Sequence, residues 1–168
     1  MIFLQWEQMV GLKQPPKSQT RRPVKDNEYG VFLKPFDYAN FSAVSYKGSH
    51  QRKWQIGKAY AVQPGRGKKA VGRTPPIKSI RRERLGDISE ADCIAEGVEK
   101  MPVATLAGSD VMVVLYRCPV CWERRLMAQD AYACLWNHCY GPGAWERMKN
   151  DDVWALEFDC VEGKGGSG

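Results

Sequence analysis

The sequence has no long apolar run. No stretch of the 168-residue sequence approaches the roughly 20 consecutive apolar residues of a membrane-spanning helix. Met1-Ile2-Phe3-Leu4 is followed at once by polar residues, so the apolar core of a secretory signal is also missing. We therefore expect a cytoplasmic protein that has no contact with a membrane.

Histidine is scarce, since only His50 and His138 occur. Neither lies in a sequence context typical of a general base, which weakens the hypothesis of a ribonuclease, although Lys17 and the arginines could stabilise phosphate. No strand–helix–strand spacing recurs, so a doubly wound parallel sheet is not favoured. Short strands with two or three short helices instead favour an α+β fold built as a small mixed barrel.

The six cysteines, without a secretory signal, are typical of reduced thiols or metal ligands. Cys118 and Cys121 have the two-residue separation of a zinc knuckle, and Cys134 and His138 lie four residues apart on one face of a predicted helix. These four residues predict a structural zinc site, with Cys139 as an alternative ligand. The other interpretation is that Cys134 and Cys139 are small core residues.

The net charge of +6 conceals two electrically opposite halves. Residues 1–84 carry 18 Lys and Arg against 5 Asp and Glu, whereas residues 85–168 carry 7 against 14. A basic, aromatic-rich half is typical of proteins that bind single-stranded nucleic acid or flipped bases. Core packing explains many of these aromatic residues equally well. The charge pattern nevertheless predicts RNA, a nucleoside or a modified nucleobase as the partner.

Apolar spacing and turn residues predict the local structure of most of the chain. The expected helices are 6–12, 89–96 and 128–138. The expected strands are 54–63, two pieces or a bulged edge strand within 70–84, a buried strand at 111–116 and a closing strand at 153–161. Residues 26–53 are expected to form a long loop or an irregular hairpin, and residues 163–168 a flexible tail.

The segment Lys17-Ser18-Gln19-Thr20-Arg21-Arg22 places an amine, a hydroxyl and two guanidinium groups close together. An amine and a hydroxyl can take part in proton transfer, and guanidinium groups hold phosphate or carboxylate in a rigid fork. The segment is therefore a candidate ligand site. A solvated basic turn is the alternative interpretation, because basic runs usually lie on the surface.

Four segments resemble the ASCH-domain proteins of phages and bacteria, which are relatives of the PUA fold. They are KSQTRRPVK from Lys17, WQIGKAYAVQPGRGKKAVGR from Trp54, SIRRERLGDISEADCIAEGV from Ser79, and LWNHCYGPGAWERMKNDDVWALEF from Leu135 to Phe158. The resemblance implies a PUA-like small mixed β-barrel with flanking short helices and a cleft suited to RNA or a modified base. It implies one domain over 1–162, with insertions at about 26–53 and 117–140, in a protein of bacterial or phage origin.

Some bacterial ASCH proteins remove the acetyl group from N4-acetylcytidine, and the resemblance implies the same amidohydrolase activity here. By this resemblance Lys17 is the base, Thr20 is the nucleophile or orients a water molecule, and Glu96 holds the lysine. Arg22 would bind the substrate or the oxyanion. This chemistry requires no cofactor.

Two further hypotheses belong to other functional classes. A non-catalytic reader of RNA or modified DNA would stack a base on Trp54 and bind phosphates through basic residues: Arg21, Arg22, Arg66, Lys68, Lys69, Arg81, Arg82 and Arg84. A phage accessory protein would instead hold a host protein through its acidic half or its cysteine knuckle. Substitution of Lys17 would leave that function intact.

Overall fold

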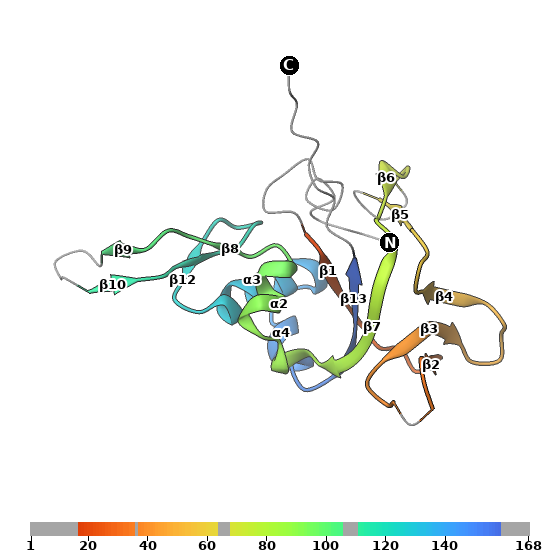
Figure 1. The fold of residues 1–168 in the computed structure, drawn as a ribbon. Helices are drawn as coiled ribbons and strands as arrows, with labels where there is room; N and C mark the ends of the chain where they lie inside the picture. The colour runs from red at the N-terminus through yellow and green to blue at the C-terminus, as the bar shows by residue number, and fades with distance from the viewer. Residues whose placement is uncertain (1–16, 36, 64–67, 106–110, 159–168) are drawn as a thin grey trace, which may run out of the picture.

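Figure 1 shows the computed structural model of the chain, which describes residues 17–35, 37–63, 68–105 and 111–158. The architecture is mixed α+β, with many short strands and few helices. Every pair of strands in the described part is antiparallel, which agrees with the absence of a strand–helix–strand pattern in the sequence. None of the described helices is long and apolar enough to span a membrane. The described strands do not close into a barrel.

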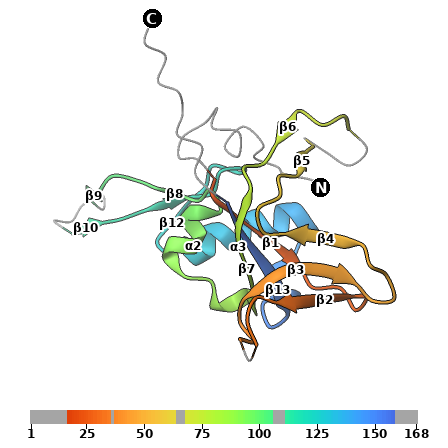
Figure 2. The ribbon, with the colours of Figure 1, turned by 45° about the vertical axis from the view of Figure 1, so that its right-hand side comes forward.

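The central sheet brings the two ends of the described chain together. Its strand order is β1 (Gln19–Pro23), β13 (Asp152–Phe158) and β7 (Ile77–Arg84). Residues 153–156 of β13 are all buried, because the sheet is covered on both faces. Helices α2 (Glu90–Ala95) and α3 (Ala128–Tyr140) lie against one face, and a second sheet lies toward the other (Figures 1 and 2).

The second sheet contains β2 (Glu28–Phe32), β3 (Phe41–Tyr46) and β4 (Arg52–Gln55). Its two hairpins occupy most of the segment that the sequence predicts as a long loop or an irregular hairpin. Strand β7 is joined to the turn that follows β4 through Ile77, which donates to Lys58 O (3.0 Å) and accepts from Gly57 N (2.8 Å). A single bridge between Asn40 and Arg81 adds to the connection.

An apolar cluster fills the space between the two sheets and contains Phe41, Val44, Trp54, Val62, Ile77, Ile80, Trp154, Leu156 and Phe158. The expected strand at 54–63 is interrupted, because β4 ends at Gln55 and β5 (Ala61–Val62) begins only after a turn in which Gly57 has a φ of 77°. A left-handed backbone at Gly57 ends the strand. The two expected strand pieces within 70–84 are confirmed as β6 (Gly72–Arg73) and β7.

Helix α2 (Glu90–Ala95) follows a 3-10 turn, η1 (Leu85–Asp87), and is confirmed where the sequence predicts it. The Ser89 hydroxyl accepts a hydrogen bond from Asp92 N (3.1 Å), as expected of a helix-capping residue. Helix α3 (Ala128–Tyr140) also agrees with prediction and ends two residues later than expected. Helix α4 (Ala144–Met148) was not predicted.

These helices pack around a second apolar cluster beside the central sheet, built from Leu85, Ile88, Cys93, Val98, Tyr116, Cys118, Ala128, Ala131, Tyr132, Leu135, Trp136, Ala144 and Val153. Cys93 is fully buried there. The segments predicted at 6–12 and 163–168, and residues 159–161 of the closing strand, lie outside the described residues.

A narrow arm extends away from the helices (Figures 1 and 2). It carries β8 (Glu99–Lys100), β9 (Ala104–Thr105), β10 (Met112–Val113), β11 (Tyr116–Arg117) and β12 (Arg124–Arg125). The prediction of a continuous buried strand at 111–116 is wrong, because Val111 is 55% and Met112 71% exposed. Val111 and Met112 lie on a ribbon that no other described layer covers, whereas Val114 and Tyr116, at the end of the same run, pack on the helical cluster.

The close packing of Phe41 on Gly30 provides a test of the second sheet. A Cβ atom added at Gly30 would lie 2.1 Å from Phe41 Cδ1. We expect Gly30→Ala to lower the free energy of unfolding by about 1–3 kcal/mol, because the ring must move within a packed core. Urea unfolding measures the change, with the exposed Lys47→Ala as control. Equal stability of the two variants would show that Phe41 does not pack on Gly30.

Candidate functional site: a buried charge cluster

The side chain of Arg21 is fully buried and lies among three carboxylates. Its Nε donates to Glu83 Oε1 (2.7 Å), and its Nη2 lies 2.5 Å from the same oxygen and 3.2 Å from Asp92 Oδ2. Nη1 donates to Gln19 Oε1 (2.7 Å) and lies 3.4 Å from Glu96 Oε1. Nη2 has these ion-pair contacts but no well-aligned hydrogen bond. One guanidinium thus connects β1, β7 and α2.

Lys17 and Glu96, which are 79 residues apart in the sequence, form an ion pair at this cluster. Lys17 Nζ lies 2.8 Å from Glu96 Oε2, and the two side chains are only 9% and 3% exposed. Glu96 directs its other oxygen, Oε1, toward Arg21. The backbone fixes this arrangement, because Ser18 N donates to Ala95 O (3.0 Å) and so holds the start of β1 against the end of α2.

The carboxylates keep the cluster ionised. Burial acts to lower the pKa of Arg21, but Glu96, with Glu83 and Asp92, has the opposite effect, and the resulting pKa lies above the ordinary value. Burial likewise acts to raise the pKa of Asp92, but the Ser89 hydroxyl and Arg21 outweigh it, so this pKa lies below the usual 3.8. Arg21 and Asp92 therefore both carry their charges at physiological pH.

Neighbouring thiol and phenol groups behave differently, because burial raises their pKa values by more than the nearby arginines lower them. Burial raises the pKa of the Cys93 thiol to about 12 and holds the pKa of the Tyr132 hydroxyl well above its ordinary value. Burial also raises the pKa of Tyr140, whose hydroxyl accepts a hydrogen bond from Arg22 Nη1 (3.3 Å). These three groups stay neutral at physiological pH.

Thr20 does not lie beside Lys17 and Glu96. It is buried, and its neighbour across the sheet is Leu156, which belongs to the apolar cluster between the sheets. Successive side chains of a strand point to opposite faces, so Thr20 faces away from the charge cluster that Arg21 faces. The structure therefore brings together two of the three residues implied by the resemblance.

Sequence reasoning missed Glu83, Asp92 and Gln19 as members of the cluster. The sequence contained one signal for Asp92. It lies four residues before Glu96, so both carboxylates are on the same face of the helix that ends at this point. Glu83 could not be assigned from its own segment, because its partner Arg21 is distant in the sequence.

The structure corrects the stacking role predicted for Trp54. Its side chain is 2% exposed, lies in the apolar cluster, and has the Lys53 amine 3.9 Å from its ring centre. A base has no free face of this ring to stack on. The large apolar ring of Trp54 stabilises the fold by packing in the core, so it is not available as a stacking surface.

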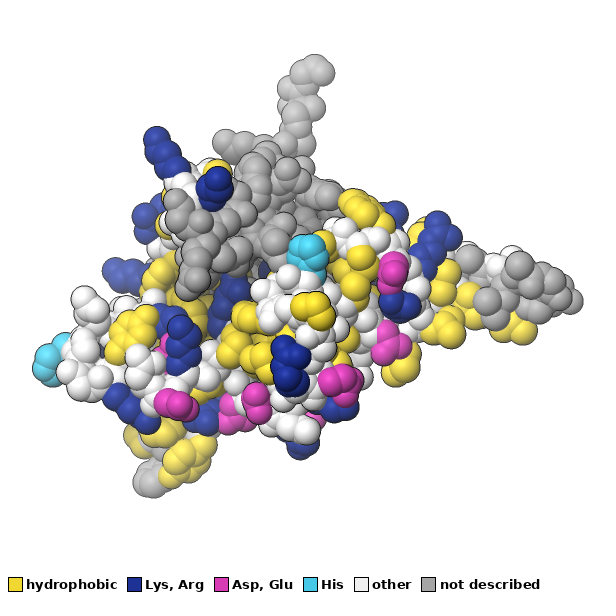
Figure 3. Space-filling model, turned by 180° about the vertical axis from the view of Figure 1, so that it is seen from behind, with side chains coloured by type: hydrophobic (Ala, Val, Ile, Leu, Met, Phe, Trp, Pro, Cys, Tyr) yellow, Lys and Arg dark blue, Asp and Glu magenta, His cyan; other side chains and the backbone are white. Residues whose placement is uncertain are grey.

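Most of the arginines predicted to contact phosphate already have acidic or polar partners. Arg81 lies within 3.4 Å of both Asp92 and Glu157, and Arg82 lies 2.6 Å from Asp152. Arg84 donates to Asn150 (2.7 Å), while Lys68 and Lys69 are exposed and Arg66 lies outside the described residues. Figure 3 shows basic, acidic and apolar side chains interspersed on one face of the molecule. Four of the predicted phosphate ligands are thus not freely available: Arg21, Arg81, Arg82 and Arg84.

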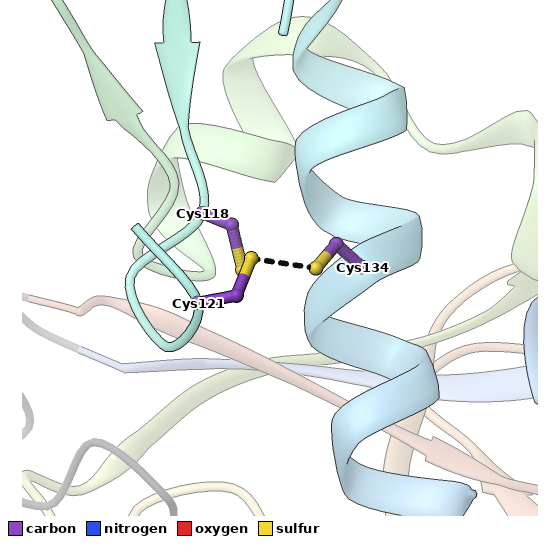
Figure 4. Close-up of side chains that lie close together, drawn as sticks. All are labelled: Cys118, Cys121 and Cys134. Carbon is purple, nitrogen blue, oxygen red and sulfur yellow. Dashed lines mark hydrogen bonds between the residues drawn. The ribbon is translucent and has the colours of Figure 1, made fainter. Parts of the chain in front are cut away.

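A second candidate site contains three cysteines. The Sγ atoms of Cys118, Cys121 and Cys134 all lie within 4.8 Å of one another, a grouping that could hold a metal ion. Cys121 Sγ and Cys134 Sγ are 2.8 Å apart (Figure 4). His138 and Cys139, the fourth ligands considered from the sequence, do not belong to this group.

A cavity of about 300 Å³ lies elsewhere, beside the start of α3, and contains neither Lys17 nor Glu96. It is lined by Ile88, Glu90, Tyr116, Leu126, Met127, Ala128 and Gln129. No polar groups other than Glu90, Gln129 and Tyr116 line it, and the Gln129 amide already donates to Gly86 O and Ile88 O. The cavity therefore has fewer groups than the charge cluster that could transfer a proton or bind a charged ligand.

No protein-family model, no curated protein and no solved structure matches this chain. Its function is therefore inferred from the chemistry of the two sites and from the resemblance of its sequence segments.

Removal of the buried guanidinium is expected to destabilise the fold strongly. Arg21→Met leaves three carboxylates close together without their shared cation, which should cost about 3–5 kcal/mol in the free energy of unfolding. Arg82→Met is the matched control, because its pair with Asp152 is 46% exposed on both sides and should cost less than about 1 kcal/mol. Urea unfolding compares them, and Arg21→Lys provides a variant that keeps the charge. Similar losses in Arg21→Met and Arg82→Met would contradict the role of Arg21.

The lowered pKa of Asp92 predicts a pH dependence of stability. A carboxyl group with a depressed pKa in the folded state contributes stability that is complete above 3.8 and is lost as the pH falls through the folded value. Asp92→Asn should therefore be less stable than the wild type at neutral pH, and the difference should shrink below pH 3.8. Urea unfolding at several pH values tests this. If the difference in the free energy of unfolding between Asp92→Asn and the wild type stays constant as the pH falls, the neighbours of Asp92 do not stabilise its charged form.

Proposed function

We propose that the chain is an ASCH-type protein that hydrolyses the N4-acyl amide of an acylated cytidine, with Lys17 and Glu96 as the reacting pair. The observation that carries the proposal is the 2.8 Å contact between Lys17 Nζ and Glu96 Oε2 in an almost fully buried position. The four sequence segments that resemble ASCH proteins support the same assignment.

The arrangement of the two main sheets supports a PUA-like barrel. They share one apolar cluster, and β7 is hydrogen-bonded both to β13 and, through Ile77, to the chain that follows β4. Continuity of this kind around a common core is expected of a small barrel. The bridge between Asn40 and Arg81 extends it.

The position of the pair favours a functional role over a purely structural one. Charged groups are costly to bury, and ion pairs in the interior often give less stability than apolar side chains of the same volume. A buried pair of this kind that is not needed for stability is therefore a candidate for chemistry. Glu96 is held by a cation at each oxygen, so its orientation toward Lys17 is fixed before any substrate binds.

In the proposed reaction, a proton passes along the hydrogen bond from Lys17 to Glu96 and leaves a neutral amine. This amine takes a proton from a water molecule as the water oxygen attacks the acyl carbon. The bond from the acyl carbon to N4 then breaks, and Lys17 returns the proton to N4. Glu96 then returns its proton to Lys17, and the carboxylic acid loses its remaining proton to solvent, so the products are cytidine and a carboxylate. Arg22, which starts on the same strand face as Thr20 but whose Nη1 reaches the Tyr140 hydroxyl at the end of α3 (3.3 Å), is proposed to bind the substrate oxygen that becomes negative.

Water is the proposed nucleophile because Thr20 faces the opposite side of β1. We assign no cofactor to the reaction, since Lys17, Glu96 and water supply every proton transfer. The group of Cys118, Cys121 and Cys134 is proposed to hold a structural zinc ion that takes no part in these steps.

Release of cytidine from N4-acetylcytidine, followed by chromatography, tests the proposal. Lys17→Ala and Glu96→Gln should each lower kcat/KM by about 10²–10⁴-fold, the usual contribution of a general acid–base group. Lys149→Ala and Glu146→Gln are matched controls, because these residues form a lysine–glutamate pair of 2.7 Å that is exposed. Both controls should retain the wild-type rate, as should Thr20→Val.

The variants must be compared at matched folding, checked by circular dichroism. If wild-type protein in large excess releases no cytidine, the catalytic proposal fails for this substrate. Binding of the nucleoside or of RNA that persists and weakens with salt would then identify a reader without chemistry. If a folded Thr20→Val variant loses turnover, Thr20 rather than water is the nucleophile.

A further inference from the structure

The loop between β11 and β12 is shaped to present two sulfur atoms toward α3 (Figure 4). Two backbone hydrogen bonds close it, from Cys118 N to Glu123 O and from Trp122 N to Cys118 O, both 3.0 Å. Trp122, directly after Cys121, has a φ of 62°. Left-handed backbone at a bulky residue is costly and persists only where its surroundings determine it. The loop is therefore held in one conformation.

Backbone N–H groups in this loop are directed at the sulfur atoms. Those of Val120 and Cys121 interact with Cys118 Sγ, and that of Glu123 interacts with Cys121 Sγ. The loop thus holds the sulfur atoms of Cys118 and Cys121 in place before any metal binds.

The third sulfur comes from α3. Cys134 lies between Ala131 and Leu135, which are buried in the helical cluster, so its position on the helix is fixed. In a tetrahedral zinc site, sulfur ligands about 2.3 Å from the ion are roughly 3.8 Å from one another. The three sulfur atoms lie within 4.8 Å of one another, so small adjustments of the side chains suffice to place an ion among them.

The fourth ligand is best supplied by His138. On a helix, a residue four positions after Cys134 is rotated by only about 40° from it, whereas Cys139, five positions after, is rotated by about 140°. His138 is exposed, and no hydrogen bond or ion pair joins it to any described residue. Its imidazole can therefore turn toward the sulfur atoms without losing a partner. Cys139 is also exposed and lies within electrostatic range of Cys118 as well as of Lys17, Arg22 and Glu96, so the rotation of the helix is what favours His138 over it.

We infer that Cys118, Cys121, Cys134 and His138 bind one Zn²⁺ ion that fastens the arm to α3. Four protein ligands leave no open position, so the ion is structural. The inference extends the proposed structural zinc to a full ligand set and a mechanical role, and it is independent of the hydrolytic activity.

A metal ion at this position would stabilise the arm, whose own strands are short. The strands β8, β11 and β12 are each two residues long, so few hydrogen bonds hold their sheet together. Tyr116 and Cys118 are buried in the helical cluster, and Val120 of the following loop packs against it while partly exposed. Metal ligation from the loop to Cys134 adds a connection where apolar burial is sparse.

A disulfide between Cys121 and Cys134 is the competing chemistry for this pair. It would use two of the converging sulfur atoms and leave Cys118 without a role, although Cys118 has N–H donors directed at its sulfur. Zinc uses all three. The two assignments differ in metal content and in thiol accessibility after denaturation.

The first experiment measures zinc in the purified full-length chain, after removal of any affinity tag, by mass spectrometry of the metal. The expected content is one Zn²⁺ per chain. Replacement by Co²⁺ should give the intense visible bands of a tetrahedral ion and the near-ultraviolet bands of thiolate ligation. Absence of metal, together with loss of two thiols that a reductant restores, would overturn the inference in favour of a disulfide.

Single variants test each ligand. Cys134→Ser should abolish stoichiometric Co²⁺ binding and increase hydrogen exchange in residues 99–105 and 111–125. His138→Ala should weaken Zn²⁺ binding by more than the roughly 10–100-fold that follows loss of an outer partner of a ligand. Cys139→Ser is the matched control and should bind as the wild type. Unchanged affinity in His138→Ala, or loss in Cys139→Ser, would overturn the assignment of the fourth ligand. Turnover of N4-acetylcytidine by metal-bound protein is measured separately, so failure of one proposal does not imply failure of the other.

Discussion

The contact of Arg21 with three carboxylates is the interaction on which the rest of the structure depends. A buried guanidinium without partners would be very costly, and so would Glu83, Asp92 and Glu96 without it. The group therefore forms as a unit, and in forming it sets the positions of β1, β7 and α2 relative to one another. The location of Glu96, and with it that of Lys17, follows from this arrangement.

The opposite charges of the two halves of the chain are largely used within the fold. Basic residues of the first half meet acidic residues of the second in the pairs Lys17–Glu96, Arg21–Asp92, Arg81–Glu157 and Arg82–Asp152. A basic half therefore does not produce an equally basic surface. The charge that the sequence suggests for nucleic-acid binding is reduced wherever such a pair forms, because a guanidinium beside a carboxylate attracts a phosphate less strongly.

The molecule is held together by different means in different regions. Apolar clusters stabilise the sheets and the helices, and the charge cluster joins them along one face of the central sheet. The arm has short strands and little buried surface, and the converging cysteines lie where it meets α3. The proposed proton-transfer chemistry and the proposed metal binding thus lie at separate sites, one at the start of β1 and one at the base of the arm.

The sequence by itself determined the features that depend on near neighbours. The cap at Ser89, the extent of α3 and the spacing of Cys118 and Cys121 all follow from groups within a few residues of one another, so local pattern was sufficient. Tertiary structure alone decided which apolar residues are covered and which charges meet. Trp54 became core while Met112 stayed exposed, although both lie in apolar segments, because burial depends on the layer that packs above a strand. The face taken by Thr20, and the meeting of the distant Lys17 and Glu96, were likewise set by the pairing of strands and helices far apart in the chain, which local periodicity does not encode.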